Sequence, residues 1–483
     1  MDFQRFFLLF FDDILNIFGN LYYILSDKIV IEKSYFFTNK MLLALFLPLL
    51  IEQALEFFVG FIDTMMVSSI GEAAVSGVFL VDSIIMLLIF SFAALATGGA
   101  VIAGQYLGNG EVNKGCEASN QLVWFAAIVS VAIAIFVLLF QTYIIDILFG
   151  QIGDDVFYNA HIYLNYMILT IPFIAVYNAG AAIYRTMGNA KLPMIIMFSC
   201  DLLNVIGNAI LLFVFGFGVE GVAIPTVFAR IIAAAVMIYL VLNQKNVLHI
   251  KKTLKHSFDF SMLKKVLDVG IPYGVENGLF QLGRILILSL VSTFGTVAIA
   301  ANAVGISFGI FSVLPGFAIN LGLTTVISRC VGANDYTQAK FYNKKIILIT
   351  FLAHLFTNLI IFIILYPVLS LYGLTPECKD LAAQMIIWHG IFGIIIWPLA
   401  FTLPTTFRGA GDAKWPMIVS LLIMFICRIA LAYVIADYFG WGVFGTWVAM
   451  FIDWYVRAIF FIYRYLSGKW MEYRAVGNSF KKV

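Results

Sequence analysis

Charged residues are scarce in this 483-residue chain. Asp, Glu, Lys and Arg together make up 12% of it, hydrophobic residues make up 62%, and the mean hydropathy is +0.99. Because a water-soluble surface needs far more charge, the composition excludes a soluble globular protein and predicts an integral membrane protein. The formal net charge of +2 says little about partners, and no nucleic-acid ligand is expected.

Several sequence motifs are also missing. The chain has no G-x-x-x-x-G-K-[ST] phosphate-binding loop and no H-E-x-x-H zinc motif. The five cysteines lack C-x-x-C spacing, which argues against a disulfide framework or a zinc site; they are Cys116, Cys200, Cys330, Cys378 and Cys427. We therefore expect no metal centre, no bound cofactor and no enzymatic activity.

Long apolar runs dominate the sequence instead. A run of roughly 20 apolar residues spans a bilayer as a helix, because a backbone in lipid must satisfy its own hydrogen bonds. The predicted fold is an all-α integral membrane protein with twelve transmembrane helices, at 41–68, 75–106, 119–147, 157–184, 190–215, 219–243, 262–293, 296–325, 345–373, 381–407, 412–436 and 441–466. Residues 1–40 carry Asp12 and Asp13 within an apolar run and no small-residue cleavage site, which favours an interfacial helix over a signal peptide.

The distribution of Lys and Arg predicts the orientation in the membrane. Basic residues concentrate in alternate loops and in the carboxyl-terminal tail, whereas the intervening loops contain only Lys379. Cytoplasmic loops are enriched in Lys and Arg. Both termini are therefore predicted to be cytoplasmic, in a multi-pass protein of the bacterial plasma (inner) membrane.

The chain contains an internal repeat. Residues 184–194 (YRTMGNAKLPM) and 407–417 (FRGAGDAKWPM) share R-x-x-G-x-A-K-x-P-M at an offset of 223, and Glu52 pairs with Glu276 at an offset of 224. Each half holds six predicted helices, so the halves are parallel repeats related by a pseudo-two-fold axis along the membrane normal. The predicted segments are an amino-terminal segment (1–40), a first lobe (41–243), a linker (244–261), a second lobe (262–467) and a tail (468–483).

Three carboxylates lie within the first predicted helix. A carboxylate at bilayer depth costs about 2.5–3.5 kcal/mol on insertion scales, so it persists only where it meets water, a partner or an ion. Steps of four and eleven residues place Glu52, Glu56 and Asp63 on one stripe of a helix. This stripe is predicted to face a polar cavity.

Residues 41–467 resemble the multidrug and toxic compound extrusion (MATE) transporters. The resemblance rests on the first helix with Asp63 fifteen residues after Pro48, the second-helix stretch ATGGAVIAGQYLGNG, the two boxes and the 6+6 helices. It implies efflux of small organic compounds, typically cationic and aromatic, driven by inward flow of Na⁺ or H⁺ and achieved by alternating access between the lobes. The choice between Na⁺ and H⁺ stays open.

The resemblance also implies a cation site in the first lobe. It maps onto Asp63, Asn178, Asn204, Asn208 and Thr226, with Asn208 standing where one branch of the family has Asp. Asp201 lies on the same helical face two turns earlier and is a candidate replacement acid. Further candidates for the cavity are Glu52, Asp82, Glu276 and Arg284.

The second lobe lacks the acids of another branch's cation site. The position eight residues after Pro272 is Phe280, and the tenth predicted helix has no acid. Glu276 is expected to pair with Arg284 or to carry protons. Asp453 and Arg457, four residues apart, are expected to form a local ion pair.

Three functions compete at this point. A secondary multidrug antiporter, acting as a monomer in the lipid bilayer, agrees with the duplication, the short loops and the intramembrane acids. A flippase for a lipid-linked saccharide precursor is the alternative, although such proteins usually have fourteen helices. A membrane-embedded enzyme would need a nucleophile or metal constellation. The two repeated boxes are interpreted as cytoplasmic turns without chemistry of their own.

Overall fold

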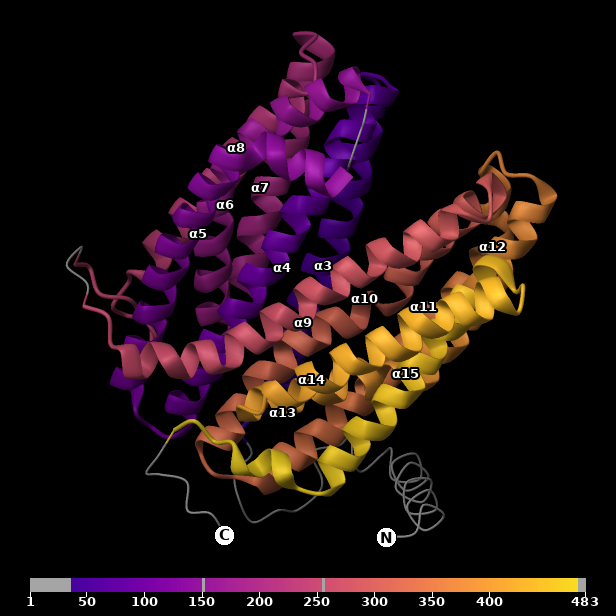
Figure 1. Ribbon diagram of the computed structural model, residues 1–483. Coiled ribbons are helices and arrows are strands. Elements are labelled where there is room, and N and C mark those ends of the chain that lie inside the picture. The colour runs from indigo at the N-terminus through magenta and orange to yellow at the C-terminus, as the bar shows by residue number, and fades with distance from the viewer. Residues whose placement is uncertain (1–35, 150–152, 254–256, 477–483) are drawn as a thin grey trace.

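The protein is an all-helical membrane bundle in a computed structural model, which describes residues 36–149, 153–253 and 257–476 (Figure 1). Within these residues, eleven helices are long and apolar enough to cross a membrane, and a bent pair supplies a twelfth span. The all-α fold and the twelve-span prediction are thus confirmed. The predicted interfacial helix within residues 1–40 lies almost wholly outside the described residues.

The helices follow the predicted apolar runs closely. The first half comprises α3 (Asn39–Ser68), α4 (Glu72–Gly108), α5 (Val112–Phe149), α6 (Asp154–Thr186), α7 (Lys191–Ala209) with the π-turn η1 (Ile210–Val214), and α8 (Glu220–Val241). The second half comprises α9 (Phe260–Ser292), α10 (Thr296–Gly332), α11 (Tyr336–Leu371), α12 (Pro376–Ile395), η2 (Pro398–Thr402), α13 (Leu403–Ala410), α14 (Lys414–Ile423), η3 (Met424–Ala430), η4 (Tyr433–Tyr438) and α15 (Gly442–Leu466).

The tenth span is broken in the middle. Its two parts, Pro376–Ile395 and Pro398–Ala410, meet at 57°. Pro398 has no backbone N–H and its ring clashes with the preceding turn, which is a usual cause of a kink. The break turns α13 inward, and all eight residues of α13 are buried.

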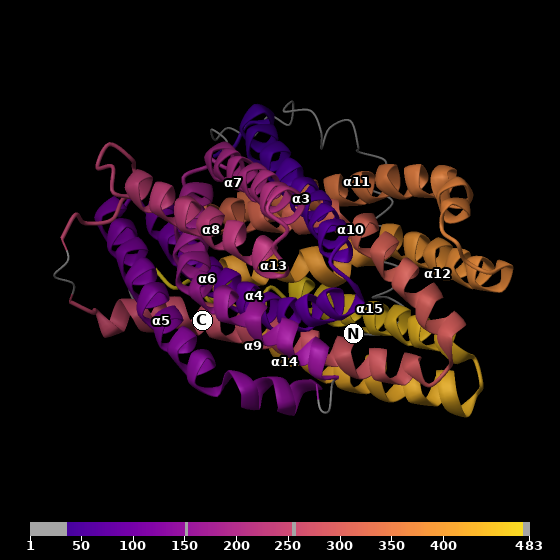
Figure 2. The ribbon, with the colours of Figure 1, turned by 90° about the horizontal axis from the view of Figure 1, so that it is seen from above.

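The two halves lie together at the end of the molecule where α3 begins and α15 ends, and they diverge toward the opposite end (Figure 1). Their first helices are exchanged. α3 packs mainly on α7 and on α10 of the second half, whereas α9 packs mainly on α4 of the first half, as the view from above also shows (Figure 2). Each half therefore contributes the first part of its first helix to the core of the other.

The exchange is visible in the buried residues. Leu42, Leu45 and Leu49 of α3 belong to the core cluster of the second half. Val266 and Val269 of α9 belong to that of the first half. Because van der Waals packing is a main source of helix association within a bilayer, these packed starting helices help to hold the two halves together.

The repeated boxes are turns, as predicted, and they also contact the opposite half. Ala190 of the first box is fully buried in the core cluster of the second half. Ala413 of the second box is 1% exposed in that of the first half. The small Ala side chain lets each turn enter the neighbouring core. The boxes are therefore part of the interface between the halves.

Close backbone contacts join the halves at the end where α3 begins and α15 ends. A Cβ on Gly332 of α10 would lie 2.1 Å from the carbonyl oxygen of Gln105. The Gln105 side chain donates to the Gly409 carbonyl at 3.1 Å and accepts from the backbone N–H of Ala475 at 2.9 Å. The segment after α15 therefore helps to hold both halves together.

A buried ion pair fixes the second box to α15. The carboxylate of Asp412, which is 1% exposed, accepts from Arg464 Nε at 2.9 Å. Burial raises the pKa of Asp412, and the Arg464 guanidinium opposes that rise. In the first box, Asn189 instead accepts from the Leu192 backbone N–H at 3.2 Å. The two turns share a shape but differ in charge.

The crossing of α4 and α9 gives a stability prediction. A Cβ on Gly98 would lie 2.5 Å from the Val266 carbonyl oxygen and 2.6 Å from the Gly270 nitrogen. Gly98→Ala is expected to lower the Tm of the detergent-purified protein, since overpacking typically costs about 1–3 kcal/mol. Gly60→Ala, also within a helix but with no atom within 4 Å, is the matched control. Equal Tm values for the two variants would contradict the close packing of α4 against α9 at Gly98.

Candidate functional site

A chain of polar side chains links three helices of the first half. Asn208 Nδ2 of α7 donates to Asp63 Oδ1 of α3 at 2.9 Å and to Asn204 Oδ1 at 3.2 Å. The Asn204 amide contacts Thr226 Oγ1 of α8 at 2.7 Å. If the Asn204 amide turns over, it donates to Asp63 at 3.3 Å and still contacts Thr226. Four of the predicted residues are thus brought together.

Helix geometry and packing create this chain. Asn204 and Asn208 are one turn apart on α7, so their side chains lie on the same face. Between them, Gly207 lies against Pro225, and a Cβ on Gly207 would be 2.7 Å from the Pro225 Cβ. The glycine therefore allows α7 to approach α8 closely enough for Asn204 to reach Thr226.

The chain is rich in oxygen atoms. Asn208 is fully buried, Asn204 is 5% exposed, and Asp63 is half-buried. Asn208 Oδ1 is buried without a hydrogen-bond partner among the described residues. A buried carbonyl oxygen beside a carboxylate suits a small cation, because hard cations take oxygen ligands and an unpaired buried acceptor is costly. The donor set therefore fits a monovalent cation or a proton on Asp63.

The remaining first-half candidates lie outside this chain. Asn178 of α6 and Asp201 of α7 are both half-buried and take no part in its hydrogen bonds. Asp82 of α4 accepts from the Tyr163 hydroxyl at 3.2 Å, which ties it to α6. Glu56 is exposed and accepts from Gln53 at 3.0 Å on its own helix. The carboxylates predicted to form one polar stripe of α3 therefore make separate contacts.

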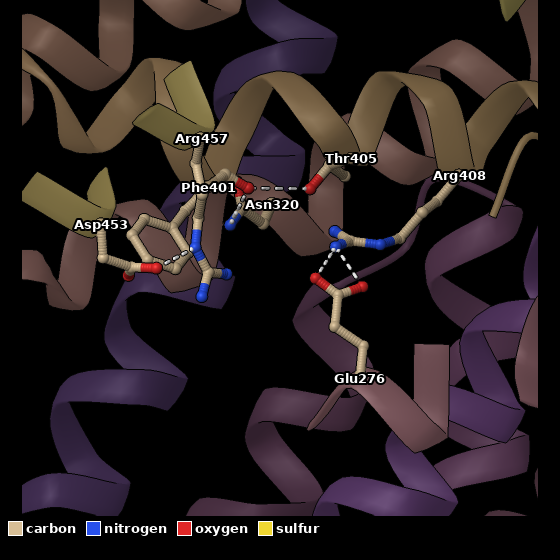
Figure 3. Close-up of polar contacts among 7 residues, drawn as sticks. All are labelled: Glu276, Asn320, Phe401, Thr405, Arg408, Asp453 and Arg457. Atoms are coloured by element: carbon tan, nitrogen blue, oxygen red, sulfur yellow. Dashed lines mark hydrogen bonds and ion pairs between the residues drawn. The ribbon is translucent and has the colours of Figure 1, made fainter. Parts of the chain in front are cut away.

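Each half contains one buried Glu–Arg pair in equivalent positions. Arg185 NH2 lies 2.9 Å from Glu52 Oε1, and Arg408 NH2 lies 2.7 Å from Glu276 Oε1 (Figure 3). The two glutamates are related by the repeat, and each arginine is the first residue that the two boxes share. The repeat thus duplicates an interaction between helices as well as a pattern in the sequence.

The expected pairing of Glu276 with Arg284 is wrong. Arg284 NH1 contacts Gln281 Oε1 at 3.4 Å, and both oxygens of Glu276 accept from Arg408. Eight residues of helix separate Glu276 and Arg284 by about 12 Å along the axis, so their side chains cannot meet. The kinked tenth span brings Arg408 beside α9 instead. In the sequence, the signal for this pair was that both the Glu and the Arg recur at equivalent positions in the two halves.

Arg408 is held by two residues of α9. Its guanidinium lies 4.4 Å from the centroid of the Tyr273 ring, one turn before Glu276, which adds a cation–π contact. Both Arg408 and Glu276 are less than 9% exposed. Such a pair is costly to break, because removing one partner leaves an uncompensated buried charge.

The second half confirms the predicted Asp453–Arg457 pair. Arg457 Nε donates to Asp453 Oδ1 at 2.9 Å, and both residues are buried. His389 packs between Trp447 and Trp454, with ring centroids 5.6 and 5.1 Å away. His354 contacts the Gly393 carbonyl at 3.1 Å. The histidines of this half are thus packed among helices, and the described residues contain no metal-binding group of three or more His, Cys, Asp or Glu.

One serine has the spacing of a hydrolase nucleophile. Residues 305–309 read GISFG, which matches G-x-S-x-G. In hydrolases this motif forms a strained turn between a strand and a helix. Here Ser307 lies inside the continuous helix α10, and its hydroxyl donates to the Ala303 carbonyl at 3.1 Å. The geometry of a nucleophile elbow is therefore absent at this serine.

Two equivalent sets of membrane-spanning helices, joined through exchanged first helices and carrying buried polar groups, define a duplicated multi-pass membrane transport protein. The MatE family profile matches it twice, over residues 48–210 and 272–434. Both ends of the two matched segments are 224 residues apart, which agrees with the repeat found in the sequence. The chain belongs to the multidrug and toxic compound extrusion (MATE) family.

Curated relatives and solved structures match almost the whole chain. The probable multidrug resistance protein NorM of Thermotoga maritima is 25% identical over 91% of this chain and 94% of its own length. The uncharacterized transporter YisQ of Bacillus subtilis is 27% identical over 88% of this chain and 93% of its own length.

Solved transporter structures share the fold. An outward-facing MATE family multidrug resistance transporter of the MOP superfamily matches with a TM-score of 0.81 at 20% identity, covering 89% of this chain and 96% of that chain. A MOP superfamily transporter of Pyrococcus furiosus, for which a reversed polarity of the binding pocket is described, matches with a TM-score of 0.82 at 20% identity and the same coverage.

The Glu276–Arg408 pair gives the second prediction. Arg408→Gln leaves the Glu276 carboxylate buried without a charged partner, which typically costs about 3–5 kcal/mol, so the Tm should fall strongly. Lys414→Gln in the same box is the control, because Lys414 is 3.7 Å from Asp268 and both side chains are exposed; such pairs contribute about 0–1 kcal/mol.

A double variant separates charge from shape. Arg408→Gln combined with Glu276→Gln removes both charges, so it should recover much of the Tm lost in Arg408→Gln alone. If Arg408→Gln lowers the Tm no more than Lys414→Gln, the pair does not stabilise the fold.

Proposed function

We propose that the protein is a secondary active multidrug efflux antiporter, which exports small organic compounds in exchange for inward-moving Na⁺ or H⁺. The observation that carries this proposal is the Asp63–Asn208–Asn204–Thr226 chain, which gathers a carboxylate and amide and hydroxyl oxygens within the membrane. Membership of the MATE family and relatives described as probable multidrug resistance proteins support a role in multidrug transport.

The coupling cation binds at Asp63 in this proposal. A proton needs one carboxylate, whereas Na⁺ needs several oxygens at once. The second carboxylate of one family branch is replaced by Asn208, so the site has one formal negative charge among neutral oxygens. As the ion enters, Asn178 of α6 and Asp201 of α7 complete the proposed site, and Asp201 then adds a second carboxylate to that of Asp63.

Helix α3 connects the cation site to the interface between the halves. Its first part lies in the core of the second half, its later part carries Asp63 to α7, and Pro48 removes one backbone hydrogen bond between them. A cation that draws Asp63 and Asn208 together therefore acts on the helix that joins the halves. Binding shifts the conformational equilibrium only by its difference in affinity between the two states.

The same proposal orients the molecule. The halves diverge away from the end where both described chain ends lie (Figure 1). With the termini in the cytoplasm, as the loop Lys and Arg residues indicate, the diverging ends face outward. Substrate release would follow from this arrangement, in a monomer that uses its own two halves as rocking units.

Gradient-driven efflux tests the proposal. Asp63→Asn should abolish ethidium efflux from proteoliposomes under an imposed Na⁺ or pH gradient, because the variant loses the only carboxylate in the hydrogen-bond chain. Wild-type efflux driven by one gradient and not by the other identifies the coupling ion. Glu72→Gln, which changes an exposed carboxylate in the first turn of α4, is the control and should retain efflux. Undiminished efflux in Asp63→Asn would overturn the cation assignment.

A further inference from the structure

In the second half, two arginines lie against the ring of Phe280, and a third stands one turn further along the helix that carries this ring. The Arg428 guanidinium lies 4.9 Å from the Phe280 ring centroid, and that of Arg457 lies 5.6 Å from it. Arg284 follows Phe280 by one turn on the same face of α9 and is within electrostatic reach of Arg428. The three arginines therefore lie near one another although they come from three elements, α9, η3 and α15.

These arginines outnumber their counterions. Asp453 is the one carboxylate paired with them among the described residues, at 2.9 Å from Arg457 and 3.9 Å from Arg428. Arg284 has only the Gln281 amide oxygen, at 3.4 Å. Three arginines and one aspartate carry a formal charge of +2 within membrane-spanning helices.

Buried donors in the cluster lack partners. Arg457 is 2% exposed, and its NH2 atom has no hydrogen-bond partner among the described residues. Figure 3 shows that Arg457 meets Asp453 through Nε, so that its terminal nitrogens point away from that carboxylate. Trp454 Nε1 is also buried and unpartnered, and the Trp454 ring lies against Phe401, which in turn contacts Arg457. An unpaired buried cationic donor is expensive, so this arrangement calls for an anion.

The cluster occupies the counterpart of the cation site. In the first half, Asn204 contacts Thr226; 224 residues later than Thr226 stands Met450, whose sulfur accepts from Arg428 NH2 at 3.3 Å. Asp63 corresponds to Ile287 by the same offset. The second half has therefore replaced the acid and placed a guanidinium where the first half has an amide.

We propose that Arg284, Arg428 and Arg457 form a subsite that binds the carboxylate or phosphate of an amphipathic, zwitterionic substrate. Guanidinium groups recognise both anions through charge-assisted, often bidentate hydrogen bonds. Phe280 and Phe401 supply apolar surface for the body of such a compound, and the acid-rich first half suits its amine. This assignment rests on the proposed export function and narrows its substrate class from organic cations to compounds that also carry an acid.

A matched pair of dyes tests the subsite by binding alone. Rhodamine 110 carries a free carboxylate, and rhodamine 123 is its methyl ester, so the two differ in the group at issue. With the full chain in neutral-lipid nanodiscs, fluorescence anisotropy should show tighter binding of rhodamine 110. Arg284→Gln and Arg428→Gln should each weaken rhodamine 110 binding by roughly tenfold to a hundredfold, because each variant loses one charge-assisted hydrogen bond. The affinity for rhodamine 123 should stay unchanged in both variants.

The control is Lys414→Gln, which removes an exposed positive charge of the second half and should alter neither dye's affinity. Equal binding of the two dyes by the wild type, or equal losses for both dyes in the variants, would overturn the proposal. So would rhodamine 110 binding that disappears when phosphatidylglycerol is added, because the anion held by the cluster would then be a lipid headgroup. The assay uses no ion gradient, so failure of the Asp63 coupling test leaves its outcome independent.

Discussion

The interaction on which the structure depends is the buried Glu–Arg pair that occurs once in each half. A lone charge within the bilayer is expensive, so Glu52 and Glu276 are retained only with Arg185 and Arg408 beside them. Each pair joins the first helix of a half to the box that ends its fourth span. The boxes reach the opposite core through Ala190 and Ala413, so the pairs also position the interface between the halves.

On this shared scaffold the two halves carry opposite charge. The first half gathers Asp63 and two amides, whereas the second half gathers arginines around Phe280. Gene duplication gives two equivalent places, and different side chains at those places separate their chemistry. A cation in one half and an acidic substrate group in the other would then act on the same interface.

The exchanged helices α3 and α9 connect that interface to both sites, because each helix packs in one core and carries residues of a site. α3 lies in the second-half core and carries Asp63, whereas α9 lies in the first-half core and carries Glu276, Phe280 and Arg284. A ligand bound by either helix in one half is thus connected through packed side chains to the other half. Two packed arrangements of rigid helices can respond to such binding as alternative states, because close-packed cores do not deform continuously.

The sequence by itself determined the membrane class, the twelve spans and the repeat, because hydropathy, helix length and a constant offset are local or periodic properties. It also brought Asp63, Asn204, Asn208 and Thr226 into one predicted site, through the family resemblance. The local Asp453–Arg457 pair followed from the i,i+4 spacing. Only the tertiary structure decided that Glu276 meets Arg408, that the first helices are exchanged, and that Arg428 and Arg457 of the last two spans converge on Phe280 of α9. Those contacts join residues tens to hundreds of positions apart. They depend on the kink at Pro398 and on glycines that let helices cross closely, and neither hydropathy nor local spacing reports these features.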